Sequence, residues 1–169
     1  MTIISPDRTG LVESIARVVA EHGGNWLESR MCRLGGEFAG ILRVEIAAEK
    51  KTALLDAMQK LQQGGLQIVI RADQLATAVV AGKQTKLEIV GSDRPGIVRD
   101  ITSALARAGV NVEEFSSELV SAPMSGEPLF KAVARLQIPE RCDLAALKKD
   151  LEKIAADLLV DVSFAELGS

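Results

Sequence analysis

The sequence of 169 residues is poor in aromatic side chains, cysteine and histidine. Aromatic residues make up 3% and tyrosine is absent, which argues against a surface that stacks nucleic-acid bases. The two cysteines, Cys32 and Cys142, cannot form a disulfide framework, and no CxxC or Cys/His cluster is present. His22 is the single histidine, so a Ser/His/Asp triad, a histidine-based zinc site or a histidine general base would have to use it. We therefore expect no catalytic residues, no metal and no cofactor.

The charge balance restricts the kinds of molecule that the protein can bind. The formal net charge is −3, with nine basic and nine acidic residues over 1–82 and eleven basic and fourteen acidic residues over 83–169. Neither half carries a basic field, so we expect no direct binding to nucleic acid. The sequence has no run of 18 apolar residues, and its first residues lack the pattern of a signal peptide. These two absences predict no membrane span and a cytoplasmic location.

The main feature of the sequence is an internal repeat. Residues 7–31 align with residues 93–117 at an offset of 86 without a gap. Nine of the 25 aligned pairs are identical: Asp7/Asp93, Arg8/Arg94, Gly10/Gly96, Val12/Val98, Ile15/Ile101, Ala20/Ala106, Gly23/Gly109, Asn25/Asn111 and Glu28/Glu114. This offset is too long for a solenoid repeat and fits a duplicated small domain. We expect one domain over 1–72, a second over 84–169, and an ordered apolar connector over 73–83.

The apolar periodicity within each copy predicts the order β-α-β-β-α-β. In the second copy, alternation over 85–91 indicates a strand, and Ile97, Ile101 and Leu105 form a helical stripe closed by Gly109. Two crossovers of this kind give an α+β, ferredoxin-like fold, with a four-stranded antiparallel sheet and both helices on one face. The first copy lacks about three residues of its first strand, so we expect either a short edge strand or a start upstream of Met1. The other expected elements are helices 9–22 and 50–63, strands from 25, over 38–46 and over 66–71, strands 111–121 and up to 138, a helix opened by Pro139 and Asp143, and strand 159–165.

The strongest local motif is Asp93-Arg-Pro-Gly between a strand and a helix, followed by Gly109-Val-Asn-Val. On this motif, residues 85–117 resemble an ACT domain, a small-molecule-binding regulatory module attached to many enzymes of amino-acid metabolism. Residues 7–31 resemble a second one, with Thr9 where the family often has proline. A chain of two ACT units and nothing else is similar, within the family, to a transcriptional regulator of glycine cleavage genes. This resemblance implies glycine as the ligand and a DNA-binding protein as the partner.

The residues of the motif also make a physical case for an amino-acid site. A glycine after a strand lets backbone N–H groups approach a ligand, and the helix N-terminus adds partial positive charge that suits a carboxylate. An asparagine supplies a donor and an acceptor for an ammonium and a carboxylate. We expect two half-sites. One consists of Asp93, Arg94, Gly96, Ile97 and Asn111, and the other consists of Asp7, Arg8, Gly10, Leu11 and Asn25. ACT units commonly pair side by side with ligands at the seam, and exposed edge strands need covering, so we expect a homo-oligomer.

Purely structural roles are open for the same residues. The aspartates could cap helices, the glycines could allow close packing of helix on sheet, and the asparagines could be turn residues.

Three functions also remain open: a ligand-sensing regulator that acts through partner proteins, an enzyme on the same scaffold such as an acylphosphatase, and a dimerisation scaffold or regulatory subunit of an amino-acid-metabolism enzyme. The phosphate loop of an acylphosphatase is missing, and the sequence favours the regulator.

Overall fold

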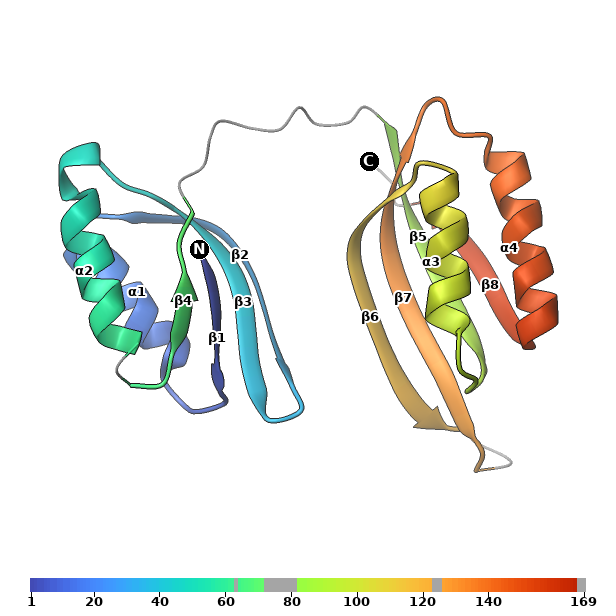
Figure 1. Cartoon of the computed structure of the whole chain (residues 1–169), viewed down its shortest axis with the longest axis horizontal. Helices are drawn as coiled ribbons and strands as arrows, with labels where there is room; N and C mark the ends of the chain where they lie inside the picture. The colour runs from blue at the N-terminus through green and yellow to red at the C-terminus, as the bar shows by residue number, and fades with distance from the viewer. Residues whose placement is uncertain (63, 72–81, 123–125, 167–169) are drawn as a thin grey trace. The chain divides into compact units, whose positions relative to one another are not determined.

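The computed structural model describes residues 1–62, 64–71, 82–122 and 126–166. The chain divides into two compact units, and we describe each by itself. In each unit a four-stranded antiparallel sheet carries both α-helices on one face (Figure 1). The expected α+β fold with two ferredoxin-like domains is therefore confirmed.

The first unit has its first strand in the interior of the sheet. The strand order is β2-β3-β1-β4, so β1 lies between β3 and β4. β1 is indeed short, but the expectation that it is an edge strand is wrong, because β2 and β4 form the two edges. The elements are β1 (Thr2–Pro6), α1 (Leu11–Glu21), β2 (Asn25–Leu34), β3 (Glu37–Glu45), a 3-10 turn (Ala48–Lys50), α2 (Lys51–Gln62) and β4 (Gln67–Val69).

The second unit repeats this topology with longer strands, in the order β6-β7-β5-β8. β5 begins at Gly82, inside the segment 73–83 that we expected to be a connector, and residues 73–81 of that segment lie outside the described residues. The elements are β5 (Gly82–Ser92), α3 (Ile97–Arg107), β6 (Asn111–Ser121), β7 (Pro128–Pro139), α4 (Leu144–Leu158) and β8 (Val160–Glu166).

Each unit buries its own aliphatic core between the sheet and the helices. Ile3, Leu42 and Met58 lie at the centre of the first core, and Leu136 and Leu151 lie at the centre of the second. The two cores share no residue. Aliphatic packing thus replaces the missing aromatic residues in both units.

The first helix of each unit ends as the sequence predicts. Gly23 and Gly109 have φ of +70° and +71°, and their amides donate to Ala20 O at 2.9 Å and Ala106 O at 3.0 Å. The following amide in each unit donates to the carbonyl five residues back, at 2.8 and 3.0 Å. This is the Schellman arrangement that ends a helix on a left-handed glycine. It fixes where β2 and β6 begin.

Candidate functional site

The two repeated loops connect the central strand of each sheet to its first helix. Gly10 and Gly96 are the N-caps of α1 and α3, with φ of +89° and +102°. A Cβ atom at Gly10 would meet no other atom within 4 Å, so the alternative that this glycine permits close packing of helix on sheet is wrong. Glycine is favoured at both positions because the backbone there is left-handed.

The start of each first helix carries no side-chain cap. The alternative that Asp7 and Asp93 cap these helices is therefore wrong. The first backbone bonds of the two helices run from Ser14 N to Gly10 O and from Asp100 N to Gly96 O, both at 2.9 Å. The N–H groups of the preceding first-turn residues have no partner within the helix and carry the positive end of its dipole. Such a helix start can hold a carboxylate.

The aspartates of the two loops differ in their surroundings. The Asp7 carboxylate forms an ion pair with Arg33 of β2. The residue equivalent to Arg33 in the second unit is Leu119, which cannot form this pair. Within the described residues, no hydrogen bond or ion pair involves the exposed Asp93 carboxylate. The second loop therefore presents a carboxylate that remains available to a ligand.

The first turns of the two helices also differ in charge. In α3, Arg99 Nε donates to Asp100 Oδ1 at 2.7 Å, and this hydrogen bond holds the pKa of Asp100 below its usual range. The Arg99 guanidinium lies close to the Gly96 turn, 3.2 Å from where a Cβ on that glycine would stand. The equivalent residue in α1 is Glu13. Glu13 itself forms an ion pair with Arg17, at 3.6 Å. The second loop thus differs from the first by a guanidinium beside the glycine turn, and this position of Arg99 was not predicted from the sequence.

The arginines of the predicted half-sites are exposed, whereas the apolar residues are buried. Arg8 and Arg94 are exposed in their loops, with no ion-pair partner among the described residues. The side chains of Leu11 and Ile97 are only 5% and 2% exposed and belong to the two cores. These two residues can offer a ligand only their backbone N–H groups.

The asparagines lie at the other end of each sheet. Asn25 pairs with Glu45, the last residue of β3, whereas Pro6, just before the first loop, pairs with Glu37, the first residue of β3. Eight residue steps of β3 separate these two positions, about 27 Å at a rise of about 3.4 Å per residue. The register of Asn111 in the second sheet is equivalent. Within one unit, the structure does not bring the asparagine to the loop.

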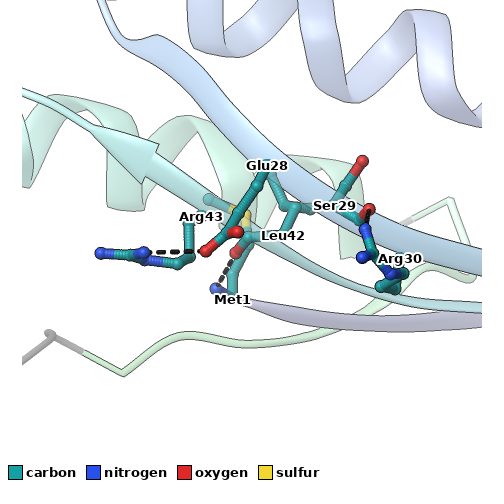
Figure 2. Close-up of polar contacts among 6 residues, drawn as sticks. All are labelled: Met1, Glu28, Ser29, Arg30, Leu42 and Arg43. Carbon is teal, nitrogen blue, oxygen red and sulfur yellow. Dashed lines mark hydrogen bonds and ion pairs between the residues drawn. The ribbon is translucent and has the colours of Figure 1, made fainter. Parts of the chain in front are cut away.

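A cross-strand ion pair recurs at equivalent places in both sheets. Arg43 Nη1 contacts Glu28 Oε1 at 2.8 Å (Figure 2), and Arg135 pairs with Glu114 in the second unit. All four side chains lie on the sheet face away from the helices and are at least one-third exposed. A pair of this kind stabilises the register of two strands by a few tenths of a kcal/mol to about 1 kcal/mol. The conserved spacing of the two glutamates was visible in the repeat, but their partners were not.

The residues that the structure describes contain no group of three or more His, Cys, Asp or Glu side chains that could hold a metal ion. No helix among them is long and apolar enough to cross a membrane.

Comparison with known proteins agrees with this architecture. A UPF0237 protein of Methanopyrus kandleri is 33% identical over 75 residues, which are 44% of this chain and 77% of that protein. A crystal structure of an unknown protein from Galdieria sulphuraria has 28% sequence identity and a TM-score of 0.81, and the match covers 99% of this chain and 96% of that one. A structure named "putative glycine cleavage system transcriptional repressor" has 19% identity and a TM-score of 0.67 over 99% of this chain and 95% of its own.

The match to a family model decides the family. The model described as "ACT domain" matches residues 1–71 and again residues 87–165. These two segments coincide with the two βαββαβ units. The chain therefore belongs to the ACT domain family and carries two copies of this regulatory domain.

Proposed function

We propose that this protein is a non-enzymatic regulator that senses an α-amino acid through the β5–α3 loop of its second ACT domain. The proposal rests on one observation: the same loop presents an Asp93 carboxylate without a partner among the described residues and the uncapped start of α3. In this proposal Asp93 binds the ligand ammonium, while the backbone N–H groups of the first turn and the Arg99 guanidinium bind the ligand carboxylate. Arg94 lies in the same loop and adds positive charge.

In this proposal an asparagine completes the site from another ACT domain. Since Asn25 and Asn111 lie about 27 Å from the loop of their own domain, by the rise of a strand, neither can reach it there. An asparagine could reach the loop of a second domain that packs alongside in the opposite direction. In this proposal a homo-oligomer supplies that second domain, and ligand binding depends on how the domains associate.

We further propose glycine as the ligand and a DNA-binding protein as the partner. We infer both from the solved structure named as a repressor of the glycine cleavage system, which resembles this chain in its fold. The net charge of −3 supports an indirect route to DNA, through contact with another protein. Ligand binding would then change the affinity for that partner by favouring one arrangement of the domains.

A thermal-shift screen of the purified chain against the twenty amino acids tests the proposed function. A ligand that binds only the folded state stabilises it by RT ln(1 + [L]/Kd), about 2.7 kcal/mol at a hundredfold excess over Kd. For a domain of this size, that corresponds to an increase of several degrees in Tm. We expect glycine to give this increase. An unchanged Tm with all twenty amino acids would contradict the sensor and favour a dimerisation scaffold.

A further inference from the structure

The two domains differ on the face of the sheet that no helix covers, which we call the open face (Figure 1). Residues directly opposite each other on paired strands share a face, and the register places Ile4, Leu34, Ile41 and Val69 on the open face of the first domain. Their side chains are 43%, 79%, 61% and 58% exposed. Among the described residues of the second domain, no large apolar side chain on the open face is this exposed.

The middle of each open face shows the same contrast. In the first domain one row of residues crosses the middle of the sheet, and we call it the central row: Cys32, Ala39, Ile4 and Gln67. In the second domain, Glu118 and Lys131 stand opposite each other at the places of Cys32 and Ala39. The fold therefore accepts charged side chains at these places, and nothing in it requires the apolar surface of the first domain. A contiguous apolar patch of this kind marks an interaction surface.

The charges beside the central row favour a second copy of this chain as the occupant. Glu37 lies two residues before Ala39 on β3, and Arg30 lies on the other side of the row, opposite Ile41. Arg30 Nη1 donates to the Ser29 carbonyl at 3.2 Å (Figure 2), and neither Arg30 nor Glu37 has an ion-pair partner among the described residues. An acid and a base on opposite sides of an apolar centre make the face complementary to itself under a two-fold rotation.

A two-fold axis along the central row brings these charges together. Sheets that pack face to face lie about 10 Å apart, with their strands within about 30° of each other. With this axis, positions on one side of the row in one copy lie over positions on the other side in the second copy. Arg30 of each copy then lies over the row of Leu34 and Glu37 of the other. Its aliphatic stem can cover Leu34 while its guanidinium pairs with Glu37.

The remaining charges of this face fall at the margin of such a dimer. Arg43, four residues beyond Ala39 on β3, already pairs with Glu28 at 2.8 Å (Figure 2), and Glu45 lies two residues further on. Under the two-fold rotation Arg43 comes opposite the Gly35 turn of the other copy, so these three charged side chains stay in water. An apolar centre with a charged rim is the usual composition of a protein interface.

We propose that two copies of this chain dimerise through the open faces of their first ACT domains. The central row lies on the two-fold axis, and Arg30 of each copy pairs with Glu37 of the other. This interface leaves the edge strands free, so it differs from the side-by-side pairing of ACT domains. It does not depend on the proposed amino-acid site in the second domain, and failure of either proposal leaves the other intact.

Sedimentation equilibrium of the full chain measures the Kd of the dimer. Ile41→Glu places a carboxylate in the apolar part of the interface, and we expect the Kd to rise at least tenfold because a buried charge without a partner is unfavourable. The matched control is Val12→Glu, the same kind of change at a 44% exposed side chain of α1, which should leave the Kd unchanged. The urea midpoint of Trp26 fluorescence shows whether the first domain of each variant is folded.

A charge reversal tests the pair between the two copies. Arg30→Glu and Glu37→Arg should each raise the Kd at least fivefold, because each change sets like charges against each other. The double variant restores opposite charges across the interface, and its Kd should lie within twofold of that of the unaltered chain.

Cys32 gives a third readout, because it lies on the proposed axis and is exposed. A short bis-maleimide should join two copies of the unaltered chain and of Cys142→Ser, but not of Cys32→Ser. A monomeric chain, no covalent dimer through Cys32, or a double variant as weak as the single ones would overturn the proposal. So would an unchanged Kd in folded Ile41→Glu, the result expected if the copies associate through their edge strands.

Discussion

Replacement of Leu151 by alanine should strongly destabilise the second domain while leaving the stability of the first unchanged. Leu151 is fully buried in the core of the second domain, and deletion of such a side chain costs about 2–5 kcal/mol of the free energy of unfolding. A loss of this size is a large part of the stability of a domain of fewer than 100 residues. The two cores share no residue, so the loss should be confined to the second domain.

The single tryptophan makes this experiment straightforward. Trp26 lies in β2 and packs against the first core, so its fluorescence reports on the first domain. In urea, Leu151→Ala should leave the fluorescence midpoint unchanged and move part of the circular dichroism transition to lower urea. Met58→Ala, the matched change in the first core, should instead move the fluorescence midpoint. A lower fluorescence midpoint in Leu151→Ala would show that the two domains unfold as one.

Replacement of Asp93 by asparagine should weaken glycine binding by about tenfold to a hundredfold. A hydrogen bond to a charged group contributes about 1.5–3 kcal/mol, and each 1.4 kcal/mol corresponds to a factor of ten in Kd. The asparagine keeps the size of the side chain but removes the charge that would pair with the ligand ammonium. Isothermal titration calorimetry of glycine into the full chain gives the two dissociation constants.

The matched control is Asp7→Asn in the first domain. Because Arg33 already pairs with Asp7, this change should alter the affinity for glycine by less than twofold. The reverse order of effects would place the ligand in the first domain. An equal loss in both variants would show that the two loops contribute equally.

The repeat and the apolar periodicity were sufficient to predict the fold. The identities from Asp7/Asp93 to Glu28/Glu114 defined two domains, and Gly23 and Gly109 fixed the ends of the first helices correctly. These features are local in sequence or depend on one residue type. The apolar pattern predicts burial less accurately at the end of a helix. Leu144 continues the apolar stripe of α4, but its side chain is 36% exposed.

The half-sites predicted from the sequence conflict with the fold predicted from it. β5 and β6 are parallel and α3 joins them, so β6 begins with Asn111 at the end of the sheet opposite to Asp93. The predicted β-α-β crossover already implied this separation. The contact between Arg33 and Asp7, 26 residues apart, was harder to predict because it requires the β2–β3 hairpin to fold. The left-handed backbone of Gly96 was hidden because a glycine after Pro95 fits several turn types.

The binding position of glycine on the protein is the decisive measurement for the proposed site. Amide chemical shifts of the 15N-labelled full chain, followed during a glycine titration, report which backbone N–H groups the ligand contacts. We expect saturable shifts centred on Ile97, Val98 and Arg99 at the start of α3, and no such shifts in Asp93→Asn at the same glycine concentration. Saturable shifts confined to the first domain, or none at the start of α3, would contradict it.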